Sequence, residues 1–292
     1  MTLAGAVLTL GLAAMEVRLQ PGVARPGDAV LVEVTGTTEA PSGQLGMTEL
    51  VFLPYRDRWV AIIGLSVEKK PGPVPFDVEG KVEDGTKQHV GGELEVRKPD
   101  FRRRQLTVSK RFTNPSKAER KWSAEDQKEF DKAFDRDFEP WTFKQPFAWP
   151  RQDEVSAPFG DLRLFNGKKK SQHFGADING EMGDPIYASN DGEVVMVREC
   201  FGSGGTVLIH HGGRLFTSYF HMSAFDVKQG QHVKRGQPLG KVGKSGRVTG
   251  PHLHFGAKLD GRWIDPESVL RLEFGSPVND QPTSAVASEG KQ

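Results

Sequence analysis

The sequence predicts a mainly β protein in which two β domains are joined by a connector that contains one helix. Apolar residues recur with a two-residue period, as at Val30, Val32 and Val34, which would share one face of a strand. The 292 residues include 34 glycines and 19 prolines, a turn-rich composition that favours many short strands over long helices. A chain of this length can hold two modest domains and a connector.

Composition narrows the possible classes of protein. Lys and Arg number 39 against 38 Asp and Glu, and this balance does not predict nucleic acid as a partner. The single cysteine, Cys200, excludes an internal disulfide framework, and we expect it to be a small buried apolar residue at the end of a strand.

Residues 1–15 form an apolar segment that is rich in small residues and too short to span a bilayer. The segment is similar to the apolar core of a secretory signal, although no Lys or Arg precedes that core. A possible signal implies an exported, periplasmic or cell-envelope protein, and a buried first strand is the alternative. No other segment is apolar enough to predict a stable membrane span. At the other end, the polar tail 276–292 is predicted to be disordered.

Residues 16–97 are predicted to form a β-sandwich of immunoglobulin-like size. The apolar run 59–63 and the alternating run 74–78 are separated from their neighbours by turn signals such as 25–28 and 70–72. No cluster of ionisable side chains in this region suggests chemistry, so we interpret it as a binding or spacer module.

Residues 98–150 are predicted to form a basic connector with a helix at 123–138. The run Arg102–Arg104 can attract an anionic polymer, but the apolar residues around it favour a solvated connector that packs on the next domain. Ser123 is the expected N-cap, and Pro140 stops the helix. The apolar stripe of the helix, which predicts core packing, consists of Phe130, Phe134 and Phe138.

Residues 151–275 are predicted to form an antiparallel β domain with an open groove. Glycine-rich turns separate short apolar runs, and no amphipathic helix of useful length is present. The main expected strands are 191–197, 206–211, 215–221, 252–259 and 262–264.

Histidines are concentrated in this second domain, and of the eight in the chain only His89 lies outside it. His252 and His254 are two residues apart on a predicted strand and would point to the same face. His173 and Asp177 supply an imidazole and a carboxylate four residues apart. His173, Asp177 and one histidine of the pair therefore make a ligand set of two nitrogens and one oxygen, which is the pattern of catalytic zinc. The other histidine of the pair and His221 are the candidates for acid–base chemistry.

The order of these motifs resembles the lysostaphin-type (LytM-like) zinc metallopeptidases, which cut peptide bonds in bacterial peptidoglycan. The resemblance covers about residues 157–266 and rests on three motifs: His173-x-x-x-Asp177, Tyr219-x-His221 and Gly250-Pro251-His252-Leu253-His254-Phe255.

The resemblance implies that His173, Asp177 and His254 bind one zinc ion per chain, and that His221 and His252 are catalytic. It implies a zinc-dependent endopeptidase that hydrolyses peptide cross-links or stem peptides of peptidoglycan. The alternative is a non-catalytic wall-binding or hydrolase-activating protein of the same family, which the complete residue set disfavours.

Two further residues are candidates for the edge of the substrate groove. Asn166, which precedes Gly167, either borders the groove or forms a plain turn. Tyr219 either donates a hydrogen bond near the site or packs in the core.

Overall fold

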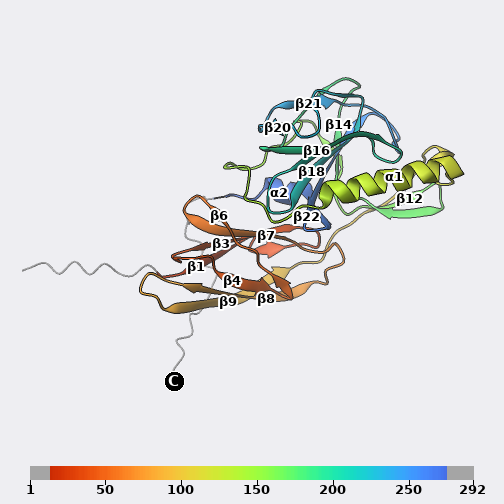
Figure 1. The fold of residues 1–292 in the computed structure, drawn as a ribbon. Coiled ribbons are helices and arrows are strands. Elements are labelled where there is room, and N and C mark those ends of the chain that lie inside the picture. Colours follow the sequence, from red (N-terminus) through yellow and green to blue (C-terminus); the bar gives the residue numbers. More distant parts are fainter. Residues whose placement is uncertain (1–13, 275–292) are drawn as a thin grey trace, which may run out of the picture.

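The computed structural model describes residues 14–274 and confirms that the protein is mainly β. Figure 1 shows an N-terminal pair of sheets lying against a C-terminal β domain, with helix α1 (Lys117–Phe134) along the side of the latter. The predicted signal core up to residue 13 and the predicted disordered tail 276–292 lie outside the described residues. No helix among residues 14–274 is both long and apolar enough to cross a membrane.

The N-terminal half contains two facing sheets that are mostly antiparallel. The first sheet has the strand order β1 (Glu16–Gln20), β3 (Ala29–Thr35), β7 (Arg58–Gly64) and β6 (Leu53–Tyr55). The second has the order β2 (Val23–Ala24), β9 (Lys87–Val96), β8 (Gly72–Lys81), β4 (Ser42–Leu45) and β5 (Thr48–Glu49).

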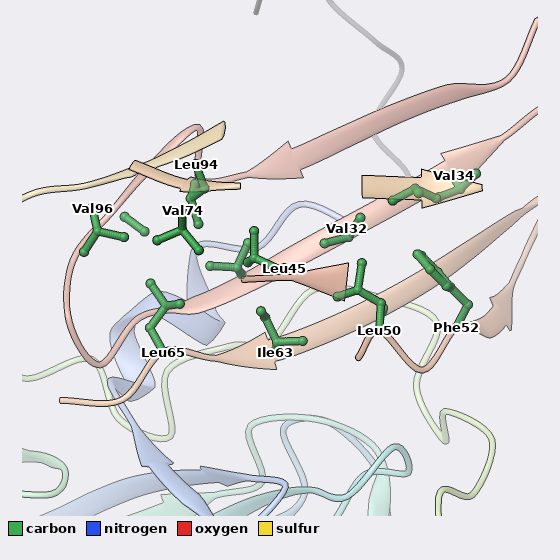
Figure 2. Packing of buried hydrophobic residues seen from close by; sticks show 14 of the residues in the cluster. Val32, Val34, Leu45, Leu50, Phe52, Ile63, Leu65, Val74, Leu94 and Val96 are labelled. Atoms are coloured by element: carbon green, nitrogen blue, oxygen red, sulfur yellow. The ribbon is translucent and has the colours of Figure 1, made fainter. Parts of the chain in front are cut away.

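An apolar core fills the space between these two sheets. Val32 and Val34 of β3 point into it and meet residues of the opposite sheet such as Leu45, Val74 and Leu94 (Figure 2). The two-residue period of the sequence is therefore the period of side chains facing this core.

Strands β3 and β7 are buried on both faces, because their outer face packs on the C-terminal domain. Leu31 and Ile62 share an apolar cluster with Leu259 and Ile264 of the other half of the chain. The approach is close at Gly64, where a Cβ atom would lie 2.5 Å from Cγ2 of Ile264. A continuous apolar interface of this kind holds the two halves in a fixed arrangement.

The C-terminal domain is organised around one large antiparallel sheet. Its order is β11 (Val155–Ala157), β14 (Ala176–Asn179), β22 (His252–Leu259), β18 (Leu215–Met222), β17 (Gly204–His210), β16 (Gly192–Cys200) and β20 (His232–Val233), and β23 (Arg262–Ile264) also pairs with β22. A smaller sheet contains β15 (Pro185–Tyr187), β21 (Pro238–Lys241) and β19 (Ala224–Phe225). The short helix α2 (Pro266–Leu270) follows β23.

The connector is attached to the second domain at both of its ends. Strand β10 (Arg103–Leu106) pairs in parallel with β12 (Leu162–Phe165), which in turn pairs with β13 (Lys169–Gln172). A short 3-10 helix, Lys110–Phe112, leads from β10 to α1.

Helix α1 begins six residues before the predicted start and ends four residues before the predicted end, so the predicted range 123–138 was wrong. The N-cap is Ser116, whose hydroxyl accepts from the backbone of Glu119 while the Glu119 carboxylate accepts from the backbone of Ser116. This capping box places the N-cap about two turns before Ser123. Phe138 consequently lies outside the helix.

The expected packing of the helix on the second domain is present. Phe130 contacts Phe220 edge-on, and Phe134 contacts Phe216 in the same way. Asp126 lies on the buried face of the helix. Its carboxylate accepts hydrogen bonds from Arg198 Nε at 3.0 Å and from the backbone of Phe201 at 2.7 Å.

We predict that Asp126→Ala lowers the free energy of unfolding by about 1–3 kcal/mol, because the buried N–H of Phe201 loses its acceptor. Glu125→Ala is the matched control, since Glu125 is an exposed neighbour on the same helix whose ion pair with Lys121 spans 3.8 Å. Thermal unfolding followed by circular dichroism measures both variants. Equal losses in the two variants would contradict the role given to Asp126.

A second prediction concerns Asp265, the N-cap of α2, which lies where the two halves meet. Burial raises the pKa of Asp265 to about 6 from 3.8. The folded chain therefore binds this proton more tightly than the unfolded chain, and stability falls as the pH rises from about 4 to about 6. Asp265→Asn keeps the capping oxygen and removes the charge. Its stability relative to the wild type should rise by roughly 2 kcal/mol between about pH 4.5 and about pH 7.5. Chemical denaturation at both pH values tests this expectation, and parallel pH profiles would contradict it.

Candidate metal and catalytic site

Three neighbouring strands of the large sheet carry the candidate site. Strand β14 pairs with β22 so that Asp177 lies opposite His254, and β22 pairs with β18 so that His254 lies opposite Phe220. His252, two residues before His254, lies opposite Asn179. Residues that directly face each other across antiparallel strands project to the same side, and this register gathers the polar side chains.

Three potential metal ligands converge at this point. Asp177 Oδ1 lies 3.0 Å from His173 Nε2 and 2.8 Å from His254 Nδ1, and the two histidine nitrogens are 3.0 Å apart. His173, Asp177 and His254 form the only group of three such residues among positions 14–274 whose ligand atoms lie this close together.

Backbone contacts orient His173 within this group. Its Nδ1 donates a hydrogen bond to the carbonyl of Pro158 at 2.8 Å, so the neutral ring keeps its Nε2 lone pair for the cluster. The backbone of His173 is also tied to Gly160 and Asp161 by hydrogen bonds in both directions. The residue therefore has a fixed position although it precedes the strand.

The two other members are tuned by burial and by each other. Burial opposes ionisation of Asp177, but its contacts with the His173 and His254 rings outweigh it and hold the pKa of Asp177 well below its ordinary value. Burial lowers the pKa of His254 to about 4. At neutral pH these two members are thus a carboxylate and a neutral imidazole, which is the protonation state that metal ligands need.

Two contacts around the cluster were not evident from the sequence. Arg163 Nη2 donates to Asp177 Oδ2 at 2.6 Å, which leaves Oδ1 directed at the histidines. A Cβ atom at Gly175 would lie 2.5 Å from His254 Nε2, so only glycine allows the chain to pass there. No local sequence pattern predicts the contact of Arg163 with Asp177, because it depends on how β12 lies against β14.

His221 reaches the site because strand β18 is irregular. His221 follows Phe220 directly and would point to the opposite face in a regular strand. Between the pairs Tyr219–Val207 and Met222–Gly205, two residues of β18 face one residue of β17, which is a β-bulge. His221 has a φ of 67°, and its ring lies 4.9 Å from that of His252. The bulge thus turns the His221 side chain toward the paired histidines.

Backbone carbonyls orient the rings of His221 and His252, as the Pro158 carbonyl orients His173. His221 Nδ1 donates to the carbonyl of Ser245 at 2.9 Å, and His252 Nδ1 donates to the carbonyl of Gly250 at 2.9 Å. Both rings therefore keep an Nε2 lone pair. Burial, reinforced by the neighbouring His252 and His254, keeps the pKa of His221 well below its ordinary value, so the ring is neutral at pH 7.

His173, His221 and His254 open onto a groove of about 370 Å³ between the large sheet and helix α1. Phe220 stacks on the His254 ring with an interplanar angle of 8°, and Phe130 of the helix packs on Phe220. The groove is lined by, among others, His173, His221, His254, Arg163, Arg247 and Phe130.

Asn166 and Tyr219, expected as candidates for the groove edge, lie elsewhere. Asn166 occupies a turn with a φ of 51°, and its side chain exchanges hydrogen bonds with the backbone of Val108 in the connector. Tyr219 is completely buried, and its hydroxyl accepts from the backbone of Ser189 and from Thr217. Neither side chain lines the groove, because both are used to hold the fold together.

Comparisons with known proteins agree with this arrangement. A sequence model of peptidase family M23 matches residues 171–266. The chain is 44% identical over 112 residues to the peptidoglycan DD-endopeptidase ShyA of Vibrio cholerae, a match that covers 38% of this chain and 26% of ShyA. It is 41% identical over 125 residues to the DD-carboxypeptidase/endopeptidase Mpg of Neisseria meningitidis, covering 43% of this chain and 28% of Mpg. The matched part thus spans only about a quarter of each relative.

A solved structure extends the similarity beyond the matched segment. The crystal structure of a putative peptidase M23 from Pseudomonas aeruginosa aligns with a TM-score of 0.62 and 25% sequence identity. The alignment covers 86% of this chain and 96% of that one, so the N-terminal half and the connector take part in it. Residues 171–266 are thus a peptidase family M23 domain, as the resemblance to lysostaphin-type peptidases predicted.

Proposed function

We propose that the protein is a zinc-dependent endopeptidase that hydrolyses peptides of bacterial peptidoglycan. One observation carries the proposal: the ligand atoms of His173, Asp177 and His254 converge at the edge of a groove, and His221 and His252 lie beside them. The five residues are those that the family resemblance assigns to metal binding and catalysis.

The chemistry of the donor set fits zinc. Two imidazole nitrogens and one carboxylate oxygen are a common ligand set for catalytic zinc, with one position left open. His173 Nε2 and Asp177 Oδ1 face each other at 3.0 Å while His173 Nδ1 carries the ring proton to Pro158. Two lone pairs repel each other at this distance unless a cation or a proton lies between them.

The ligands also have the outer contacts that metal ligands require. Pro158 orients His173, and Arg163 holds the second oxygen of Asp177. When bound, zinc would lower the pKa of a water molecule and polarise the carbonyl group of the substrate.

His221 and His252 are the proposed acid–base pair of the reaction. Each keeps an Nε2 lone pair because its Nδ1 donates to a backbone carbonyl, so each can accept a proton from water and return it to the leaving amine. In protonated form, either ring can donate a hydrogen bond to the oxyanion that develops on the attacked carbonyl.

The substrate proposal rests on the relatives. ShyA is named a peptidoglycan DD-endopeptidase and Mpg a DD-carboxypeptidase/endopeptidase, so cross-links between two D-centres, such as D-alanyl-diaminopimelate, are the first bonds to test. Action on peptidoglycan implies an exported or cell-envelope location. A non-catalytic wall-binding or activating role is the alternative, and no feature of the site favours it.

We predict that the purified protein binds one zinc ion per chain and releases peptides from walls with D-alanyl-diaminopimelate cross-links. Zinc is measured by elemental analysis, and the released fragments by mass spectrometry, with glycine-bridged walls in parallel. Chelation should abolish release, and added zinc should restore it. A zinc-loaded protein that releases nothing from either wall type would leave only the non-catalytic alternative.

Three histidine variants separate the residues that bind the metal from those that transfer protons. His254→Ala should lose both zinc and activity, because it removes a ligand. His221→Ala should keep zinc and lose activity by about 10²–10⁴-fold, the usual contribution of general acid–base catalysis. His232→Ala, which removes an exposed histidine of the same domain, should change neither property. Retained turnover in His221→Ala would exclude its catalytic role.

A further inference from the structure

Two arginines line the groove beside the candidate ligands, and one of them has no partner. The Arg247 guanidinium lies 4.6 Å from the centre of the Phe165 ring, a cation–π contact with no carboxylate. Within residues 14–274, this side chain makes no ion pair and no hydrogen bond. Arg163 is bonded to Asp177 through Nη2, while its buried Nε has no hydrogen-bond partner.

Positive charge in this corner is only partly neutralised by the protein, through the ion pair of Arg163 with Asp177. Burial and the charge of Arg163 both lower the pKa of Arg247, and burial and Arg247 lower that of Lys169 on β13. Arg163 has the Asp177 carboxylate as its counter-charge, whereas neither Arg247 nor Lys169 forms an ion pair within residues 14–274. An anion bound at Arg247 would find unused N–H donors.

The nearby carboxylates are already engaged. Asp126, on the opposite wall of the groove, accepts from Arg198 and from the backbone of Phe201. Asp177 gives one oxygen to Arg163 and directs the other at His173 and His254. Neither forms an ion pair with Arg247, so an anion that binds there would come from outside the described residues.

The position of this corner relates it to the reaction. Arg247 follows Ser245 by two residues, and the Ser245 carbonyl accepts from His221. Arg163 is bonded directly to the candidate ligand Asp177. Arg247 thus belongs to the segment that orients His221, and it lines the same groove as His173, His221 and His254.

We propose that Arg247 forms a subsite for a carboxylate group of the substrate peptide close to the bond that is cut. A guanidinium offers paired N–H donors in a plane that matches a carboxylate. This inference rests on the proposed peptidase function and adds the part of the substrate that the groove recognises.

A peptide cross-link has two sources of such a carboxylate. In D-alanyl-diaminopimelate, the carbon that carries the scissile nitrogen also carries a free carboxylate. The second source is the C-terminal carboxylate of the stem peptide that contains this diaminopimelate. A glycine bridge has no carboxylate next to its scissile bonds, so the subsite would also favour diaminopimelate walls.

The test uses a synthetic D-alanyl-diaminopimelate cross-linked dimer in three forms. One has both carboxylates free, one has the carboxylate beside the scissile amide converted to carboxamide, and one has the C-terminal carboxylate converted. For the zinc-loaded full-length protein, one of the two conversions should lower kcat/KM by about tenfold or more, the usual effect of losing a charge-assisted hydrogen bond. The conversion that does so identifies the source.

Arg247→Gln should remove this discrimination, so that the free and the sensitive amidated dimers are cleaved with similar kcat/KM. Arg247→Lys keeps the charge but loses the planar fork, and should retain part of the discrimination. Arg262→Gln, an exposed arginine on β23, is the matched control and should keep the wild-type ratio. Zinc content and circular dichroism establish that each variant is folded.

The outcomes separate this inference from the proposed function. If the wild type cleaves all three dimers equally, the subsite is excluded and the peptidase proposal stands. Discrimination that persists in Arg247→Gln excludes Arg247 as its source. If no dimer is cleaved, the peptidase proposal fails, and titration of the three dimers into the protein decides the subsite: equal Kd values exclude it.

Discussion

The antiparallel pairing of β14 with β22 is the constraint on which the candidate site depends. It places Asp177 opposite His254 and leaves His252 opposite Asn179. Side chains alternate along a strand, so a slip of one residue would turn the histidine pair to the other face of the sheet. The register is secured by the alternate residues Ile178, Leu253 and Phe255, which are buried in the core beneath the sheet. Core packing on one face thereby determines ligand geometry on the other.

The site also relies on departures from regular structure. The bulge in β18 turns His221 toward His252, and the residue adopts a left-handed φ that few non-glycine residues tolerate. Such local strain persists only where the surroundings hold it, and hydrogen bonds of His221 to Ser203 and Ser245 do so here. Arg163 acts similarly on Asp177 from a strand outside the large sheet. The arrangement of five polar side chains is thus supported by contacts from several separate segments.

Segments outside the family M23 match contribute to the groove. Helix α1 supplies Phe130, which packs on Phe220, and Phe220 in turn stacks on His254. The N-terminal sheets contact the domain through β3 and β7 and share an apolar cluster with β22 and β23. The Pseudomonas aeruginosa structure aligns over most of the chain, so this combination of parts is not unique to the present protein. Ala133 of α1 is buried in an apolar cluster with Leu208 and Phe216, which makes the connector helix a fixed wall of the groove.

The sequence by itself determined the β class and the five residues of the candidate site, because strand period and motif order are local properties. Period two placed His252 and His254 on one face but did not distinguish them; the register with Asp177, 77 residues away from His254, does. The helix start was misread although the capping box is local. The bulge at His221, the burial of Tyr219 and the contact of Arg163 with Asp177 were decided only by tertiary structure, because each depends on which distant strand lies alongside.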